Sequence, residues 1–248
     1  MDAASFGIIG ALEDEIAPIR SAMEDTSSTA AGGYEFIRGT LENRPIVLVA
    51  CGIGKVNAAV ACTLLIDRYK PGCIISTGSA GGILTDLAIG DVIIPDGLVY
   101  HDADVSGLGF ALGQIPGQPA VFPVHEYLIR IGEGVIDGLV KSGDLPGSLK
   151  RRRGIIGTGD VFMHDQAKIE DLKRNFPQVL AVEMESAAIA QACSLFSIPL
   201  LVIRSISDVA GIESPVSFSE FLPLAAKHSC EIVRGIVGAV KGDSCLQG

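Results

Sequence analysis

Three groups of carboxylates, each at the end of an apolar, strand-like run, could carry chemistry in this chain of 248 residues. They are Glu13-Asp14-Glu15, Val182-Glu183-Met184-Glu185-Ser186 and Arg204-Ser205-Ile206-Ser207-Asp208-Val209. A carboxylate that ends a strand lies at the carboxyl edge of the sheet, which is where α/β proteins bind ligands. The pattern therefore predicts one cleft in which the carboxylates have separate roles.

Glu183 and Glu185 have the spacing of one strand face, or of the two sides of a strand-to-helix turn. Met184 between them offers an apolar surface, and a sugar site needs both a carboxylate for the hydroxyls and an apolar plane for the ring. A different interpretation is a helix N-terminus, where the helix dipole favours acids. Asp208 has a similar alternative as a cap or turn residue, so neither signal is specific on its own.

Glycine-rich turns follow several strand-like runs and favour close approach of the backbone to a ligand. Gly52-Ile53-Gly54-Lys55 opens a helix and could bind a phosphate, but it lacks the spacer and the Ser or Thr of a P-loop. Gly7-Ile8-Ile9-Gly10 lacks the G-x-G-x-x-G pattern of a dinucleotide site. Thr77-Gly78-Ser79-Ala80-Gly81-Gly82 is not a G-x-S-x-G elbow, so we predict a ligand contact or a plain tight turn there, not a nucleophile.

Composition and charge exclude several classes of function. A net charge of −10 would repel nucleic acid, and the four histidines show no metal-ligand spacing, so we expect no nucleic-acid partner and no metal site. The six cysteines form no C-x-x-C pair, which predicts free thiols in the reducing cytoplasm. No signal peptide is evident, and the uncharged stretch 186–203 fits a helix, a turn and a strand better than a membrane span. The basic run 150–153 is expected to be a solvated loop, with an anion site as the alternative.

The elements that must position these residues alternate along the chain. Strands are predicted for Phe6–Ala11, Glu35–Leu41, Pro45–Cys51, Cys73–Thr77, Asp91–Pro95, Gly154–Thr158, Val179–Val182 and Leu200–Ser205. Helices are predicted for Glu13–Asp25, Val56–Arg68, Glu126–Lys141, Asp165–Asn175, Glu185–Phe196 and Ser219–Val240. The short connection at Glu42-Asn43-Arg44 predicts a hairpin. We expect an α/β fold with one domain over residues 1–248, a three-layer α/β/α sandwich with a central mixed β-sheet.

Two segments do not follow this alternation. Residues 96–123 form a long stretch rich in Gly and Pro with apolar side chains, which predicts a binding wall or a subunit contact. A loop packed on its own core is the alternative. The tail after Lys241 is expected to be frayed.

Together these motifs resemble the 5′-methylthioadenosine/S-adenosylhomocysteine nucleosidases of the nucleoside phosphorylase superfamily, over roughly residues 6–240. The resemblance rests on Gly7-Ile8-Ile9-Gly10-Ala11-Leu12-Glu13-Asp14-Glu15, Gly52-Ile53-Gly54-Lys55-Val56, Thr77-Gly78-Ser79-Ala80-Gly81-Gly82, Tyr100-His101-Asp102-Ala103-Asp104-Val105, Ala181-Val182-Glu183-Met184-Glu185-Ser186 and Arg204-Ser205-Ile206-Ser207-Asp208. That family cleaves the N-glycosidic bond of an adenine nucleoside with a 5′-thio substituent. The resemblance implies a hydrolase that releases adenine and a 5-thio-substituted ribose.

The resemblance also implies roles for individual residues. Asp208 matches the acid that protonates adenine N7, and Glu15 matches the base that activates the water. Ser207 would help to orient Asp208, and Phe218 would be an apolar cover. The implied substrate-binding residues are Leu12, Ile53, Ser79, Ala80, Gly81, Val105, Leu108, Ile115, Phe162, Met163, Glu183, Met184, Glu185, Arg204, Ser207 and Phe218. The family is usually homodimeric, so residues 104–118 are expected at the interface, where Leu108 and Ile115 would join the partner's 5′-substituent pocket beside Ile53.

The chemistry agrees with these roles. Adenine is a poor leaving group until its ring nitrogen accepts a proton, so Asp208 must hold a proton near neutral pH, which burial favours. Bond cleavage leaves an oxocarbenium-like sugar that the Glu185 carboxylate would stabilise. Water activated by Glu15 would then attack the opposite face. This chemistry needs no metal or organic cofactor, so none is expected.

Leu12 and Leu108 depart from the Met and Phe that many bacterial members carry at the 5′ pocket, which leaves the preferred 5′-group open. Three alternatives therefore stand beside the main hypothesis. One is 6-amino-6-deoxyfutalosine nucleosidase activity, another is phosphorolysis by a purine nucleoside phosphorylase, and the third is a nucleoside-binding protein without catalysis.

Overall fold

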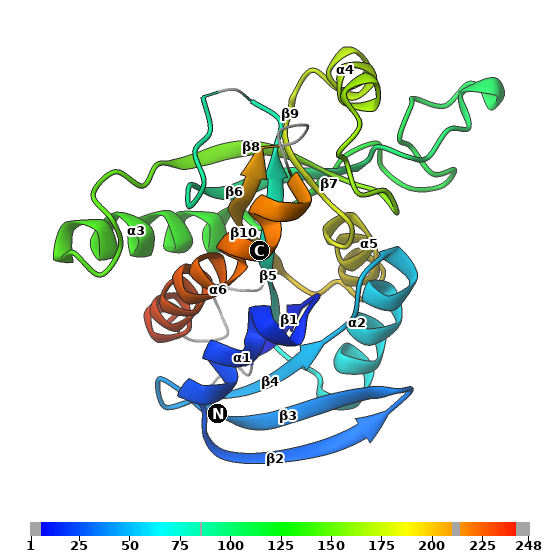
Figure 1. Ribbon diagram of the computed structural model, residues 1–248. Helices are drawn as coiled ribbons and strands as arrows, with labels where there is room; N and C mark the ends of the chain where they lie inside the picture. The colour runs from blue at the N-terminus through cyan, green and yellow to red at the C-terminus, as the bar shows by residue number, and fades with distance from the viewer. Residues whose placement is uncertain (1–5, 85, 210–213, 242–248) are drawn as a thin grey trace.

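The computed structural model describes residues 6–84, 86–209 and 214–241, without the side chains of residues 209 and 214–218 (Figure 1). Its strands are β1 (Phe6–Gly10), β2 (Glu24–Ala31), β3 (Tyr34–Leu41), β4 (Arg44–Ala50), β5 (Cys73–Gly82), β6 (Val92–Tyr100), β7 (Phe122–Pro123), β8 (Arg151–Thr158), β9 (Val179–Glu183) and β10 (Leu200–Val209). Its helices are α1 (Glu13–Ala22), α2 (Lys55–Tyr69), α3 (Glu126–Ser142), α4 (Gln166–Asn175), α5 (Ser186–Phe196) and α6 (Ser214–Ala239), with a 3₁₀ turn, η1 (Ser106–Leu108). The predicted tail after Lys241 lies outside the described residues.

All of these strands belong to one mixed sheet, and β5 is its central member. The first half of β5 pairs with β1 and its end pairs with β9, while β10 runs along the other edge. Through β6 and β8 the sheet then closes on itself, in the order β5-β10-β6-β8-β9. This closure places Gly81 of β5 opposite Asp208 of β10 on one side and Val182 of β9 on the other. The carboxyl ends of three strands therefore meet at one point.

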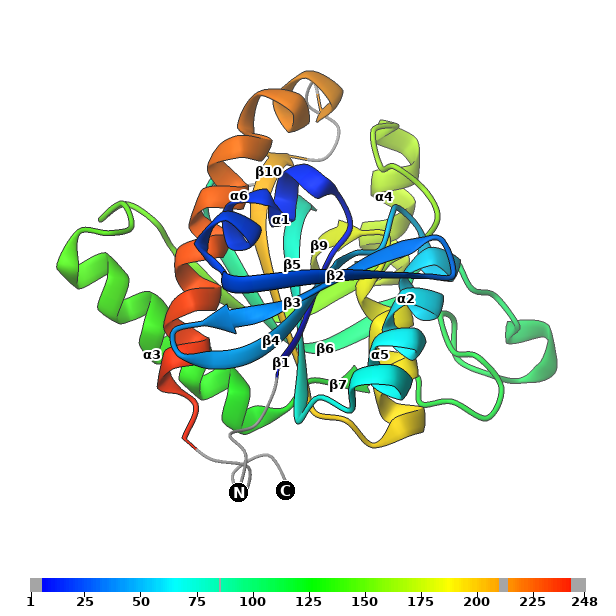
Figure 2. The ribbon, with the colours of Figure 1, turned by 90° about the horizontal axis from the view of Figure 1, so that it is seen from below.

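Helices cover the sheet on two sides. In Figures 1 and 2, α1, α3 and α6 lie on one side, and α2 and α5 lie on the other. The core between these layers is mostly aliphatic and includes Ile8, Leu48, Ile75 and Ile203. An α/β fold with a mixed central sheet and flanking helices is therefore confirmed. Among the helices that the structure describes, none is long and apolar enough to cross a membrane.

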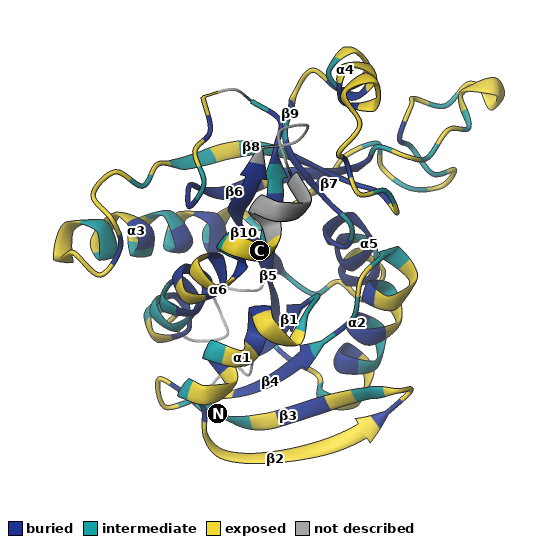
Figure 3. Ribbon diagram, in the orientation of Figure 1, coloured by how far each residue is buried: buried dark blue, intermediate teal, exposed yellow. Residues whose placement is uncertain are grey.

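Strand β2 was not predicted from the sequence. The predicted helix 13–25 ends at Ala22, and the chain then turns into a strand that is exposed along nearly its whole length (Figure 3). An exposed edge strand shows no apolar alternation, so its own residues carry no strand signal. The Gly32-Gly33 turn, where both residues have positive φ, was the available sign of a hairpin with β3. The predicted hairpin between β3 and β4 is confirmed.

The segment 96–123 begins differently from the prediction, because β6 continues to Tyr100. The loop from His101 to Val121 then projects from the body of the molecule (Figure 1). The basic run is also not a loop, since Arg151, Arg152 and Arg153 open β8. Each of these arginines forms an ion pair with a carboxylate, so their charges have partners within the chain. The five described cysteines are buried and free, as predicted; Cys245 lies outside the described residues.

Candidate active site

Glu15 lies in the first turn of α1 and is held by four hydrogen bonds. The backbone N–H groups of Ala11 and Leu12 donate to Oε2, at 3.0 and 3.1 Å. The N–H and the hydroxyl of Ser79 donate to Oε1, at 2.8 and 2.7 Å. Gly78 allows this approach, because a Cβ there would lie 2.9 Å from Oε1 of Glu15. The two motifs, far apart in sequence, thus form one rigid carboxylate site.

A β-bulge in β10 sets the direction of the Asp208 side chain. The register between β10 and β5 shifts between Ile206 and Asp208, so Ser207 is an extra residue in the strand. Such a bulge lets neighbouring side chains face the same side. Both Ser207 and Asp208 are buried and line the same pocket, and the Ser207 hydroxyl donates to Oδ1 of Asp208 at 2.8 Å. The burial expected of the acid is therefore present, with Asp208 only 3% exposed.

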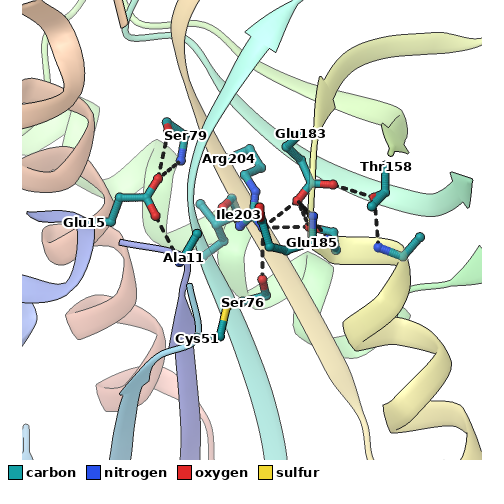
Figure 4. A network of polar contacts seen from close by, with 12 residues as sticks. Ala11, Glu15, Cys51, Ser76, Ser79, Thr158, Glu183, Glu185, Ile203 and Arg204 are labelled. Atoms are coloured by element: carbon teal, nitrogen blue, oxygen red, sulfur yellow. Dashed lines mark hydrogen bonds and ion pairs between the residues drawn. The ribbon is translucent and has the colours of Figure 1, made fainter. Parts of the chain in front are cut away.

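Glu183 is the centre of a buried ion-pair network beneath the pocket (Figure 4). Its Oε2 accepts from Arg204 Nη2 at 2.9 Å and from the hydroxyl and N–H of Ser186, both at 2.8 Å. Thr158 donates to its Oε1. Burial alone would raise the pKa of Glu183, but Arg204 and these hydrogen bonds outweigh it and lower that pKa below its usual value. Glu183 is therefore an ionised partner of Arg204, and its oxygens are largely occupied by the protein.

Glu185 differs from Glu183 in its hydrogen bonds and in its pKa, although the two residues are only two positions apart in the sequence. It is the N-cap residue of α5, and among the described residues its carboxylate accepts one hydrogen bond, from the N–H of Gly54 at 2.8 Å. Burial and the neighbouring Glu183 charge raise the pKa of Glu185 to about 8. The strand-to-helix turn was one of the two predicted arrangements. Both acids line the cavity, but the oxygens of Glu183 are largely occupied by the protein, whereas Glu185 has a raised pKa.

One cavity of about 150 Å³ joins these groups. The predicted site residues that line it are Leu12, Glu15, Ile53, Ser79, Ala80, Gly81, Phe162, Met163, Glu183, Met184, Glu185, Ser207 and Asp208. Ala11, Val161 and Val182 line it too and were missed, because small or aliphatic residues carry no chemical signal. Arg204 lies behind Glu183. Among the lining residues that the structure describes, there is no Lys, Arg or His.

Three predicted residues lie away from the cavity, and a fourth has a side chain outside the described residues. Val105, Leu108 and Ile115 belong to the projecting loop and do not line this chain's cavity, and Leu108 is 75% exposed. Phe218 belongs to α6, but its side chain lies outside the described residues. Sequence reasoning also missed Thr158 and Ser76, which hold Glu183 and Arg204; a hydroxyl inside a strand gives little sign of such a role.

Comparison with known proteins places this fold and pocket in a family. The model of the phosphorylase superfamily matches residues 5–238. A 5′-methylthioadenosine/S-adenosylhomocysteine nucleosidase from Geobacillus thermodenitrificans is 46% identical over 234 residues, which are 94% of this chain and 96% of that protein. The chain therefore belongs to the phosphorylase superfamily and, within it, to the family of 5′-methylthioadenosine/S-adenosylhomocysteine nucleosidases.

Solved structures agree with this placement. The nucleosidase of Colwellia psychrerythraea, in complex with adenine, has a TM-score of 0.92 and 41% identity, covering 97% of both chains. The Neisseria meningitidis enzyme, in complex with methylthio-immucillin-A, has a TM-score of 0.90 and 38% identity, covering 96% of this chain and 100% of that one. A futalosine hydrolase of Helicobacter pylori is less similar, with a TM-score of 0.87 and 31% identity, covering 96% of this chain and 99% of that one.

Proposed function

We propose that this protein hydrolyses the N-glycosidic bond of 5′-methylthioadenosine and S-adenosylhomocysteine, releasing adenine and a 5-thio-substituted ribose. The observation that carries the proposal is the meeting of Glu15, Glu185 and Asp208 around one small cavity. These carboxylates come from three separate parts of the chain. The similarity to nucleosidases at 46% identity over 94% of the chain supports the same activity.

In this proposal Asp208 donates a proton to adenine N7. Its side chain is buried and lines the cavity, where the Ser207 hydroxyl donates to Oδ1 and orients the carboxyl group. Phe162 and Met163 also line the cavity, and the family resemblance assigns them to contacts with adenine. Protonation withdraws electrons from the glycosidic bond, so that it breaks toward an oxocarbenium-like sugar.

Glu185 and Glu15 then act on the sugar and the water. Glu185 faces the cavity beside Met184 and is placed to bind ribose and to balance the developing positive charge. Glu15 is the general base that takes a proton from the attacking water. Its four hydrogen bonds hold the carboxylate in one orientation, so little reorganisation is needed when the water attacks.

The charges of the cavity favour hydrolysis over phosphorolysis. A phosphate nucleophile needs cationic groups, yet the ionisable carboxyl and basic side chains among the described lining residues are all acids: Glu15, Glu183, Glu185 and Asp208. Arg204 is occupied by Glu183, Ser76 and Ser186. The cavity therefore offers phosphate no free cationic partner, whereas a water molecule needs none.

A second proposal concerns assembly and location. We infer a homodimer in which residues 104–118 contact the partner, because the apolar Leu108 and Leu112 stand exposed on the projecting loop. A cleft beside this loop is lined by Val56, Leu195 and Phe196 of the exposed α2 and α5 surfaces and could receive the same loop from a second copy.

We also propose a cytoplasmic location and a single domain. Free thiols support the location, and one continuous sheet supports the single domain.

The test is release of adenine from 5′-methylthioadenosine with and without inorganic phosphate. Hydrolysis predicts equal rates and free 5-methylthioribose as the sugar product. A ribose 1-phosphate product would overturn the assignment in favour of phosphorolysis. Parallel assays with 6-amino-6-deoxyfutalosine would show whether the activity of the more distant relatives is shared.

A further inference from the structure

Lys55, the first residue of α2, follows the Gly52–Gly54 turn and contacts two other loops, through Asp102 and Asp160. Its Nζ donates to both carboxylate oxygens of Asp102, at 2.7 and 2.6 Å, and lies 3.7 Å from Asp160. Its backbone N–H donates to Oδ1 of Asp160 at 2.8 Å, and the N–H of Asp160 donates to Asp102 at 2.9 Å. Nζ also lies 5.4 Å from the centre of the Tyr100 ring, within cation–π range. We call Lys55, Asp102 and Asp160 the lysine cluster.

The lysine cluster is joined to the cavity on two sides. Gly54, the residue before Lys55, donates its N–H to Glu185 at 2.8 Å. Asp160 is followed by Val161, Phe162 and Met163, which line the cavity. The helix N-terminus, which the sequence offered as a phosphate site, is therefore occupied by the protein's own carboxylates. The side chains of Lys55 and Asp102 are only 25% and 18% exposed, so their pairing is partly shielded from water.

We infer that Lys55 is a positioning residue: its ion pair with Asp102 fixes the backbone N–H of Gly54 that orients Glu185. The inference rests on the proposed role of Glu185 as the ribose carboxylate. The Lys55 side chain is not among those that line the cavity. It acts through the Gly52–Gly54 turn, where Gly54 has a φ of 99° that few other residues adopt without strain.

The electrostatics of Glu185 give this inference a measurable consequence. Burial and Glu183 raise the pKa of Glu185 to about 8, while the Gly54 N–H and Arg204 lower it. Glu15 and the buried Cys51 thiol also face the group. When the turn is released, the hydrogen bond from Gly54 is lost and the pKa of Glu185 must rise further. The anionic form needed by the developing cation is then scarcer at neutral pH.

The experiment compares Lys55→Met, Asp102→Asn and Lys55→Arg with wild type. Lys55→Met keeps the aliphatic stem, and Asp102→Asn breaks the same pair from its other side. Lys70→Met is the matched control, since Lys70 ends the same helix and pairs with Asp67 at 3.0 Å on the exposed surface. For each variant, kcat and KM for 5′-methylthioadenosine are measured against pH. The Glu185 carboxyl is titrated by carbon-13 NMR, with its signal assigned from Glu185→Gln.

Lys55→Met and Asp102→Asn are expected to lower kcat/KM at neutral pH by about tenfold or more, equivalent to about 1.4 kcal/mol. Most of the loss should fall on kcat, because the Glu185 charge is needed most in the transition state. The acid limb of the profile and the NMR titration should both move to higher pH. Lys55→Arg should retain most of the wild-type kcat/KM, and Lys70→Met should have the same kcat/KM and the same Glu185 titration as wild type.

Unchanged titration of Glu185 in Lys55→Met and Asp102→Asn would overturn the inference, even if both variants melt at lower temperature. That result would mean that the lysine cluster is an ordinary structural ion pair. Wild-type protein without nucleosidase activity would instead refute the proposed function, and the NMR titration would still decide whether Lys55 sets the state of Glu185.

Discussion

Replacement of Glu15 by Gln should destabilise the fold, although the two side chains have nearly the same shape. Both oxygens of Glu15 accept hydrogen bonds, Oε2 from Ala11 and Leu12 and Oε1 twice from Ser79. A Gln has one acceptor oxygen and one NH₂ donor. In either orientation its NH₂ must face at least one backbone N–H that has lost its acceptor.

The magnitude follows from these contacts. A buried donor left without an acceptor costs about 1–3 kcal/mol, and Glu15 is only 4% exposed. For a chain of this size each kcal/mol corresponds to about 2–4 °C in Tm, so Glu15→Gln should melt about 2–12 °C below wild type. Replacement of a catalytic carboxylate often leaves protein stability unchanged or increases it, so a decrease in Tm would point to the hydrogen bonds of Glu15 as the cause.

Glu185→Gln is the opposite case and serves as the control. The pKa of Glu185 is raised from 4.5 to about 8 in the folded protein, so wild type holds a proton there that the unfolded chain has lost. The protonated Glu185 therefore stabilises wild type fully below pH 4.5. This contribution to the free energy of unfolding is lost as pH rises from 4.5 to about 8, at about 1.4 kcal/mol per pH unit. The neutral Gln keeps an acceptor for Gly54, so this variant should gain stability over wild type as pH rises.

Thermal and urea unfolding of wild type and both variants, at mildly acidic and at alkaline pH, would measure these effects. Equal or greater stability of Glu15→Gln than of wild type at both pH values would refute the reasoning. It would mean that the backbone donors around Glu15 find other acceptors. A Glu185→Gln difference that does not grow with pH would show that the carboxyl is solvated in the native protein.

Two further predictions concern catalysis and assembly. Asp208→Asn should lower kcat by about 10²–10⁴-fold with a much smaller change in KM, because it removes the proposed general acid while keeping the shape of the side chain. Activity within about threefold of wild type would mean that Asp208 is only a turn residue. Combined with Glu15→Gln it should give far less than the product of the two losses, since both act on one transition state. Leu108→Asp should weaken the proposed dimer and raise KM for 5′-alkylthio substrates, as checked by light scattering and kinetics. A fully active monomer would contradict this prediction.

Much of the site could be predicted from sequence because its acids stand directly beside regular elements. Glu15 in the first turn of α1 and Asp208 near the end of β10 follow apolar runs that are unmistakable strands. Edge strand β2 could not be found in the same way, because its residues are exposed and only the pairing with β3 makes them a strand. The extension of β6 to Tyr100 was also hidden, since Pro95 and Gly97 interrupt its apolar pattern.

The sequence by itself determined the α/β alternation, the hairpin of β3 and β4, and the acids that end the strands, because these depend on local periodicity and turn chemistry. Only the tertiary structure decided the hydrogen-bond partners and the charge state of each acid. Glu183 and Glu185 look alike in sequence, yet closure of the sheet brings Arg204 and Thr158 to Glu183, whereas the Glu185 carboxylate has one hydrogen-bond donor among the described residues, the N–H of Gly54. A carboxylate's charge state depends on its solvation and neighbours, and those neighbours come from distant strands. The lysine cluster has the same origin, since Lys55, Asp102 and Asp160 meet only when α2, β6 and β8 are in place.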